Sequence, residues 1–262
     1  MSNTRTGDAS VADGQPANHG RRDVAADVKA MWDVLAGGGV VICPGSVGYT
    51  MAASSKEAVA RMNQAKGRGG HKRLGLMMGD KGERQVHELD ASKREIIDCV
   101  TKDYDLPLVV IAKYRPDHHL IRQLDDDILK LCTANGTVSA GVNMGGWFLN
   151  AINQLEVEDL RPILASSANR SGRGVKASVE EIEPEVVAAA DLVIDYGPVR
   201  HHSSVASTQI NFETMELVRW GVCFDSIAWV LRRHFGIELP PDPGRDVAPG
   251  GHVNEFALAD VE

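Results

Sequence analysis

The sequence predicts a single α/β domain with a mixed parallel and antiparallel sheet and flanking helices. In the first part of the chain, short β-branched runs alternate with stretches of helical periodicity, which is typical of α/β layers. Later strands follow one another over short connections, which favours antiparallel pairs in the same sheet. The sequence shows no internal repeat and no interdomain linker, so one domain is expected.

The predicted helices have apolar residues at helical spacing or recognisable ends. Val24, Val28 and Met31 recur at such a spacing, and the glycines of 36–39 end this first helix. A second helix has Ser54 or Ser55 as its N-cap residue. The predicted helices span 23–35, 55–66, 92–102, 117–134, 147–157 and 226–236, with one or two short helices in 178–190.

The predicted strands are short apolar runs bounded by turn residues. "VVIC" at 40–43 is closed by Pro44, and "LPLVVIAKY" at 106–114 is the strongest such run. "SVASTQINF" and "MELVRWG" are expected to pair as a hairpin, with "ETM" between them. The predicted strands span 40–43, 73–78, 106–114, 137–144, 162–168, 191–197, 204–212 and 215–221.

Both ends of the chain have the composition of tails. Residues 1–21 are polar and rich in Gly, Ser, Asn and Asp, which predicts disorder. Residues 238–262 are rich in Pro and Gly and are also predicted to be a tail. The domain is therefore expected to span 22–237.

Composition excludes several classes of protein. The formal net charge of −8 argues against non-specific nucleic-acid binding, although a local basic pocket remains compatible with it. We find no signal-peptide pattern and no apolar run long enough to span a membrane, so a cytoplasmic protein is expected. The four cysteines are far apart and contain no CxxC pair, which favours apolar core positions in a reducing compartment.

Three stretches could carry chemistry. The loop 66–73 is basic and glycine-broken, which suits a polyphosphate, but a solvated helix C-terminus would have the same composition. "SSANRSG" at 166–172 offers hydroxyls, an amide and open backbone N–H groups to an anion, or is an ordinary polar turn. Ser207 and Thr208 lie in a strand-like run and are a weak signal alone.

Other common site patterns are absent from the sequence. There is no GxxxxGK[ST] loop, no GxGxxG after a strand, no HExxH and no GxSxG. His118–His119 and His201–His202 are adjacent pairs that do not share a face of a strand or helix. No metal site is therefore predicted from the protein's own side chains.

An ordered set of motifs resembles the YrdC-like family, the threonylcarbamoyl-AMP synthases. The set comprises "PGSVGYTM" at 44–51, "KGRGGHKRL" at 66–74, "SANRSG" at 167–172, "ST" at 207–208 and "RWG" at 219–221. Their order and separations are similar to those of the family over residues 22–236. The resemblance implies a twisted mixed sheet with flanking helices around a basic cavity.

The resemblance also implies a reaction. Family members combine an amine, bicarbonate and ATP into a carbamoyl adenylate and release pyrophosphate. The substrate's own carbamate is the nucleophile, so the protein needs to position reactants and neutralise charge on the phosphates. ATP would bind with Mg²⁺ held through its phosphates. The partners would be a small-molecule amine or amino acid and bicarbonate, with RNA not favoured and the chain a monomer or homodimer.

Site residues are assigned by position in the family motifs. The resemblance implies that Lys66 and Arg68 grip the triphosphate, and that Tyr49 lies on the acceptor side. Lys72 is an electrostatic assignment without a family counterpart. The residues expected to hold the nucleotide are Ser167, Asn169, Ser207 and Arg219.

The sequence departs from the family on the acceptor side. The P-T-[DE]-T turn is replaced by Pro44 to Val47, which leaves Ser46 as its hydroxyl, and Asn143 stands where an arginine is common. A site that loses its hydrogen-bonding groups rejects the old substrate, so we expect an acceptor other than threonine. The alternatives are a true threonylcarbamoyl-AMP synthase and a non-catalytic nucleotide- or RNA-binding protein.

Overall fold

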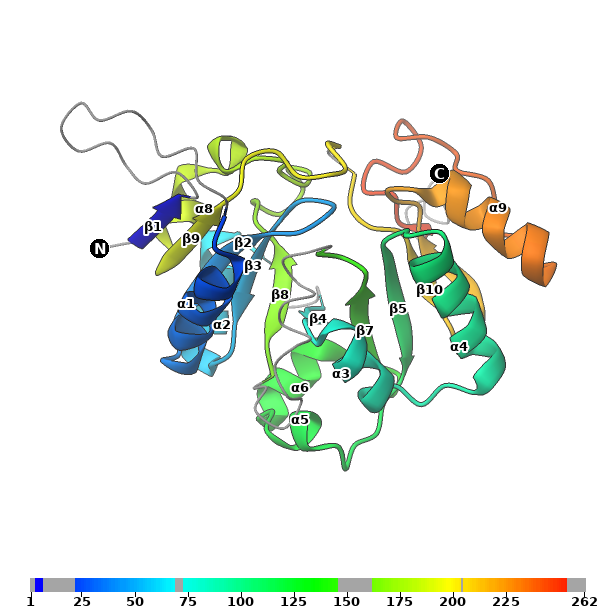
Figure 1. The fold of residues 1–262 in the computed structure, drawn as a ribbon, viewed down its shortest axis with the longest axis horizontal. Helices are drawn as coiled ribbons and strands as arrows, with labels where there is room; N and C mark the ends of the chain where they lie inside the picture. Colours follow the sequence, from blue (N-terminus) through cyan, green and yellow to red (C-terminus); the bar gives the residue numbers. More distant parts are fainter. Residues whose placement is uncertain (1–2, 7–21, 69–72, 146–161, 204, 254–262) are drawn as a thin grey trace, which may run out of the picture.

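The computed structural model describes residues 3–6, 22–68, 73–145, 162–203 and 205–253. Its centre is a sheet of 11 strands in the order β1-β9-β2-β3-β8-β4-β7-β5-β10-β11, with β6 paired to β7 (Figure 1). The strands are β1 (Asn3–Thr6), β2 (Val40–Pro44), β3 (Tyr49–Ala53), β4 (Gly75–Leu76), β5 (Leu108–Lys113), β6 (Thr133–Ala134), β7 (Thr137–Val142), β8 (Leu164–Ser167), β9 (Leu192–Asp195), β10 (Gln209–Asn211) and β11 (Glu216–Arg219).

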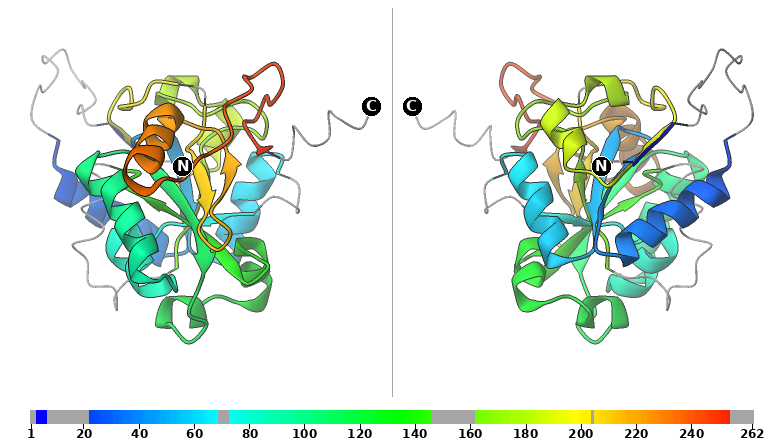
Figure 2. Two further views of the ribbon diagram at one scale, coloured as in Figure 1. Left: turned by 90° about the vertical axis from the view of Figure 1, so that its right-hand side faces the viewer. Right: turned by 90° about the vertical axis from the view of Figure 1, so that its left-hand side faces the viewer.

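Parallel and antiparallel pairs both occur, which confirms the predicted mixed sheet. For example, β2 pairs parallel with β9 and antiparallel with β3. Helices flank this sheet, and α1 and α2 lie on opposite sides of it (Figure 2). The helices are α1 (Val24–Ala36), α2 (Lys56–Ala65), α3 (Gly79–Val86), α4 (Ala91–Asp98), α5 (His119–Arg122), α6 (Asp126–Cys132), α8 (Pro184–Ala188) and α9 (Phe224–Phe235), with a π-helical turn at Cys99–Asp103 and a 3₁₀ turn at Val179–Glu181.

Two hydrophobic clusters support the two halves of the sheet. The first surrounds β2, β3 and β9 and includes Ile42 and Met51. The second lies between β5, β10, α4 and α9 and includes Phe212 and Ile227. Strand β2 is buried along its whole length, whereas β7 alternates between buried and partly exposed residues, as its sequence pattern requires.

Most predicted elements are confirmed, and Ser55 is the N-cap residue of α2. Strand β3 was not predicted, because its residues directly follow the glycine-containing turn that ends β2. The predicted helix 117–134 is two helices, α5 and α6, separated by the turn that precedes the N-cap residue Asp125. Helix α3 was also missed, and the predicted helix 147–157 lies outside the described residues.

Both predicted tails differ from the structure in part. Residues 3–6 form β1, which pairs parallel with β9 and extends the sheet by one edge strand. Residues 238–253 pack back on the domain: Trp220 Nε1 donates to Pro240 O at 3.0 Å, and Gly251 O accepts from Trp220 N at 2.8 Å. Ala248 is fully buried there. A buried tryptophan therefore anchors a segment whose composition indicates a tail.

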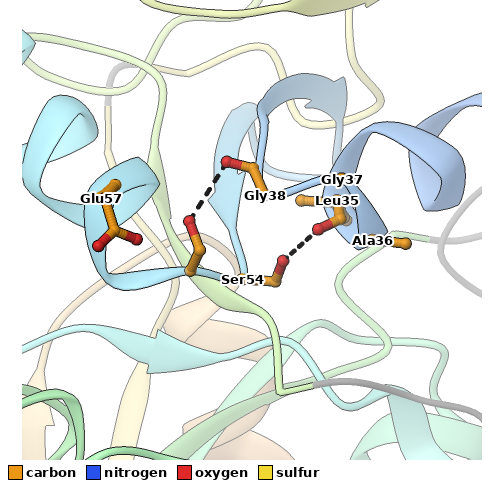
Figure 3. Close-up of a pocket in the computed structure, with 7 residues that line it drawn as sticks. Leu35, Ala36, Gly37, Gly38, Ser54 and Glu57 are labelled. Atoms are coloured by element: carbon orange, nitrogen blue, oxygen red, sulfur yellow. Dashed lines mark hydrogen bonds between the residues drawn. The ribbon is translucent and has the colours of Figure 1, made fainter.

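A shallow depression of about 440 Å³ lies where α1 ends and α2 begins (Figure 3). Ser54 donates to Leu35 O, and Ser55 Oγ donates to Gly38 O at 3.2 Å, so these hydroxyls join the two helix ends.

None of the described helices combines the length and the apolar composition that crossing a membrane requires.

Candidate functional site

The topology brings the predicted site residues to one edge of the sheet. Strands β2 and β8 end and β3 begins at this edge. Strand β7 ends beside the starts of β5 and β10 and the end of β11, and the bond from Ser46 Oγ to Asn143 O at 3.4 Å joins the end of β7 to the turn between β2 and β3. It is the upper edge in Figure 1, and the segment between β9 and β10 crosses above it. The predicted residues at or beside this edge are Ser46, Tyr49, Lys66, Arg68, Asn143, Ser167, Asn169, Ser207 and Arg219, whereas Lys72 lies outside the described residues.

Lys66 holds the turn that follows β8. Its side chain is only 2% exposed, and its ammonium group donates to the main-chain carbonyls of Ser167 and Asn169, the latter at 2.6 Å. The carbonyl of Lys66 in turn accepts from the Ser171 N–H at 2.9 Å. The end of α2 and the turn 167–171 are therefore one rigid unit. Lys66 thus shapes the turn, which differs from the predicted direct grip on a triphosphate.

This turn contains polar atoms that are buried but not satisfied within the part of the chain that the structure describes. Asn169 Oδ1 and Ser171 Oγ are shielded from water and have no hydrogen-bond partner there. Asn169 is 6% exposed. Most buried polar groups in proteins are paired, so these two atoms of one turn are available to water or to a bound polar molecule.

Arg68 lies beside the same turn. Its Nη1 donates to Ser166 Oγ at 3.0 Å, and its Nη2 donates to the main-chain carbonyl of Arg73. Burial lowers the pKa of the Arg68 guanidinium, since desolvation disfavours its charge. This partly dehydrated cation would interact strongly with an anion that reached it.

Arg219 is a second desolvated cation at this edge. Its Nε donates to Ser207 O at 2.8 Å, and the Gln209 amide, with its oxygen turned toward the guanidinium, accepts from Nη2 at 2.8 Å. Burial lowers the pKa of Arg219 to about 10, so the group stays charged at neutral pH. No carboxylate among the described residues pairs with it. A desolvated cation without a counter-ion favours an anionic ligand.

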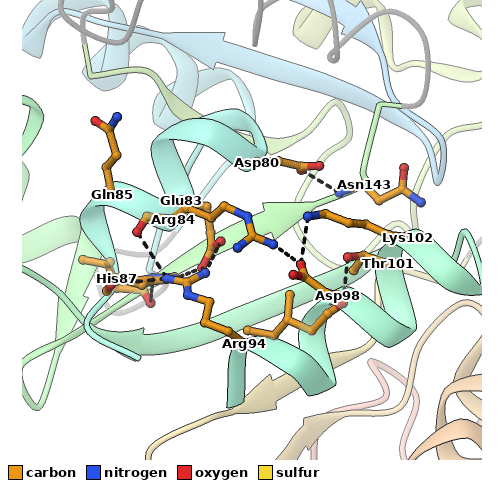
Figure 4. Close-up of polar contacts among 12 residues, drawn as sticks. Asp80, Glu83, Arg84, Gln85, His87, Arg94, Asp98, Thr101, Lys102 and Asn143 are labelled. Carbon is orange, nitrogen blue, oxygen red and sulfur yellow. Dashed lines mark hydrogen bonds and ion pairs between the residues drawn. The ribbon is translucent and has the colours of Figure 1, made fainter. Parts of the chain in front are cut away.

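Ser46 and Asn143 are in contact, as an acceptor site built from both would require. Ser46 Oγ donates to Asn143 O at 3.4 Å. The backbone N–H of Asn143 donates to Asp80 (Figure 4), and its Nδ2 donates to Asp105 Oδ1 at 2.9 Å. Asp105 also forms an exposed ion pair with Arg200 at 2.7 Å. The predicted acceptor residues therefore lie next to an exposed ion pair.

Backbone strain is concentrated near these residues. Asp105, Asn143 and Cys223 are three of the five described non-glycine residues with positive φ, at 53°, 52° and 61°. Such conformations are unfavourable for residues with a Cβ and cluster at functional sites. No local sequence pattern marks Asp105, Arg200 or Cys223, because their contacts join segments that are far apart in the chain.

Tyr49 does not line an acceptor site in this structure. It is fully buried, and its hydroxyl accepts from Tyr196 N at 3.0 Å and lies 3.0 Å from Asp195 Oδ1 and 2.9 Å from Gly197 O. Burial raises the pKa of this hydroxyl above its usual value. Tyr49 therefore joins the start of β3 to the end of β9, which corrects the prediction of a substrate contact.

The depression in Figure 3 contains none of the predicted site residues. It is lined by Ser54 and Ser55 at the other end of β3, whereas the site residues lie near Tyr49. The concave basic cavity implied by the family resemblance therefore stays a prediction. Within the described residues, no three His, Cys, Asp or Glu side chains lie close enough together to hold a metal ion.

The mixed sheet and the polar edge define an α/β protein of YrdC-like architecture. The Sua5/YciO/YrdC family model, described as "Telomere recombination", matches residues 33–221. Because this match covers more than half of the chain, the protein belongs to the Sua5/YciO/YrdC family. The comparison with curated proteins gives no match.

Solved structures share the fold at low sequence identity. A hypothetical protein, smu.1377c from Streptococcus mutans UA159, has a TM-score of 0.67 and 19% identity, covering 91% of this chain and 97% of that one. Sua5 of P. abyssi in complex with L-threonine has a TM-score of 0.63 and 18% identity, covering 92% of this chain and 63% of that one. YciO of E. coli has a TM-score of 0.61 and 19% identity, covering 85% and 97%.

Proposed function

We propose that this protein forms a carbamoyl adenylate from an amine or amino acid, bicarbonate and ATP, with release of pyrophosphate. Membership of the Sua5/YciO/YrdC family supports a reaction of this class. The observation that carries the proposal is Arg219, a desolvated guanidinium at the site edge with no carboxylate partner among the described residues. ATP, carrying Mg²⁺ on its phosphates, would supply the missing negative charge.

The described residues fit a nucleotide on one side of the site. Arg68 and Arg219 would neutralise phosphate oxygens, and charge-assisted hydrogen bonds of this kind are the stronger ones in proteins. The unpaired Asn169 Oδ1 and Ser171 Oγ would gain partners from bound ATP. Lys66 would act indirectly, by fixing the turn that presents Asn169.

The chemistry needs no protein nucleophile. The amine and bicarbonate give a carbamate and water. A carbamate oxygen then attacks the α-phosphorus of ATP, the bond from this phosphorus to the bridging oxygen breaks, and pyrophosphate leaves. Arginines at the site would stabilise the charge that develops on the phosphate oxygens, so positioning and electrostatics would supply the rate enhancement.

The acceptor is proposed to be an amine or amino acid other than threonine. L-threonine is the ligand in the Sua5 structure of P. abyssi. In this chain Ser46 lies in the turn that replaces the family's threonines, Asn143 stands where an arginine is common, and Asn143 contacts the Asp105–Arg200 ion pair. These groups differ in charge and hydrogen bonding, so selectivity should differ with them.

The test is a pyrophosphate-release screen over a panel of amines and amino acids, with and without bicarbonate. We expect release with ATP that requires bicarbonate and one amine class, together with an adenylate product detected by mass spectrometry. The Arg68→Ala variant should lose most of this activity. Release with threonine alone would identify a threonylcarbamoyl-AMP synthase, and ATP binding without any release would identify a non-catalytic nucleotide-binding protein.

A further inference from the structure

His201 and Cys223 form a side-chain pair next to the acceptor side. Cys223 precedes α9 and His201 lies in the segment that crosses above the sheet edge. Cys223 Sγ lies 3.8 Å from His201 Nδ1, within the range of a hydrogen bond that involves sulfur. The backbone N–H of His201 donates to Ser46 O at 2.9 Å, which fixes the histidine against the turn that replaces the family's threonines.

The contact between the two side chains bears on where the imidazole proton lies. Burial raises the pKa of the Cys223 thiol, and burial followed by the nearby Arg200 charge lowers the pKa of His201. Both groups are therefore neutral at neutral pH. A neutral thiol donates to Nδ1 when that nitrogen carries no proton, and the ring proton then lies on Nε2; in the other tautomer Nδ1–H would donate to the sulfur.

The Nε2 atom of His201 has no hydrogen-bond partner in the part of the chain that the structure describes. The atom is shielded from solvent, and no described donor or acceptor reaches it. A buried, unpaired N–H is unfavourable, and its presence at a site indicates a ligand oxygen that completes it. Such an arrangement suits a hydrogen-bond donor whose acceptor is supplied by the bound substrate.

The surroundings of His201 indicate which part of the substrate this would be. On one side the residue contacts Ser46, which in turn bonds to Asn143. On the other side Cys223 follows Val222, which is bridged to Ser207 on the nucleotide side. His201 thus lies between the proposed acceptor and nucleotide positions, where the carbamate forms and attacks.

We propose that His201 Nε2 donates a hydrogen bond to an anionic oxygen of the bicarbonate-derived group, and that the Cys223 thiol is the positioning residue that fixes the required tautomer. The inference rests on the proposed function for the identity of the ligand. It assigns roles to two residues that the sequence motifs do not mark.

The tautomer can be measured without any turnover. In ¹⁵N NMR spectra of the histidine-labelled full chain, we expect His201 Nδ1 to be the unprotonated nitrogen near neutral pH. The Cys223→Ser variant keeps a donor and should keep this tautomer, whereas Cys223→Ala should lose it and give a mixture. A proton on Nδ1 in the unmodified protein would overturn the proposal.

The ligand contact is tested with sodium bicarbonate and a non-hydrolysable ATP analogue as probes. Their joint addition should shift the His201 Nε2 resonance and leave that of His202, an exposed neighbour with a 66% exposed side chain, unchanged. No shift at saturating concentrations of both would contradict the inference. This NMR measurement does not require turnover. A failure of the His201 assignment can therefore be distinguished from a failure of the proposed enzyme activity.

Kinetics give a second measurement. The His201→Ala variant should raise the KM for bicarbonate by about 10- to 100-fold, the range expected for a lost hydrogen bond to a charged group, with little change in ATP affinity. His201→Gln should recover part of the loss, because its amide can donate, and His202→Ala is the matched control. Weaker ATP binding with an unchanged KM for bicarbonate would overturn the assignment.

Discussion

The ammonium group of Lys66 lies 2.6 Å from the main-chain oxygen of Asn169 and is almost completely buried. This contact joins the C-terminal end of α2 to the turn after β8, two segments about a hundred positions apart in sequence. The lysine therefore acts on the site through the shape of a turn, and the site residues depend on it for their arrangement.

The Lys66→Met variant should weaken both folding and nucleotide binding. The substitution keeps most of the side-chain volume but leaves buried carbonyls without a donor, which costs about 1–3 kcal/mol of unfolding free energy. ATP affinity should fall at least about tenfold because Asn169 is no longer held. Urea unfolding and calorimetric titration with ATP measure the two effects, with the exposed Lys113→Met as control. Unchanged ATP affinity would show that the turn does not bind nucleotide.

The Arg219→Met variant should separate stability from binding. Removal of a desolvated cation that lacks a carboxylate partner should leave the unfolding free energy within about 1 kcal/mol of its original value. ATP affinity should fall about 10- to 100-fold, as expected for a lost charge-assisted contact. Thermal-shift measurements with and without ATP test this, with the exposed Arg233→Met as control. An equal ATP-induced shift in both variants would remove Arg219 from the site.

Stability at acid pH should depend on Glu83. Its carboxylate is buried, and burial alone would raise its pKa, but the hydrogen bond with His87 and the Arg94 guanidinium outweigh this effect and lower the pKa (Figure 4). A lowered pKa in the folded state stabilises the protein above the unfolded value, about 4.3 for Glu, and this contribution is lost as pH falls through the folded value.

The Glu83→Gln variant should therefore be destabilised at pH 7 by about 3 kcal/mol, because Arg94 is left buried without its charge partner. The difference from the original protein should begin to shrink below the unfolded pKa of about 4.3 and should be lost as pH falls through the lower pKa of Glu83 in the folded state. Urea unfolding at several pH values measures this, with the exposed Glu88→Gln as control. A difference that stayed constant down to pH 3 would refute the assignment.

The Tyr49→Phe variant should affect folding and not substrate selectivity. The buried hydroxyl bonds to Tyr196 N and lies within hydrogen-bond distance of Asp195, so its removal should cost about 1–3 kcal/mol. The KM for the acceptor should not change, because no atom of Tyr49 is exposed. The exposed Tyr104→Phe serves as control for stability. A raised KM with normal stability would restore Tyr49 to the acceptor side.

Local patterns predicted much of this fold. The β-branched run of β2 and the apolar periodicity of α1 and α9 identify their elements because the core requires those patterns. The break between α5 and α6 was missed because the acidic residues there are compatible with a solvated helix face as well as with a helix start. Packing of 238–253 was missed because it depends on Trp220, a contact that composition does not reveal.

The site was predictable only to the level of its segments. The order of motifs assigned Ser167, Asn169, Ser207 and Arg219 to one nucleotide site, through the resemblance to the family. The motifs did not show that the Lys66 ammonium group donates to main-chain carbonyls, nor that Tyr49 is buried. These depend on side-chain direction and burial, which come from tertiary packing.

Residues 238–253 pack back on β11, so part of the protein around Arg219 is contributed by this segment. A methyl group at the α-carbon of Gly251 would collide with the main-chain oxygen of Trp220 and the side chain of Arg245, and would touch the side chain of Arg219. Any version of this protein shortened at 237 for crystallisation or screening would lose that cover. Nucleotide affinity measured on such a fragment would then describe a more hydrated arginine than the one in the intact protein.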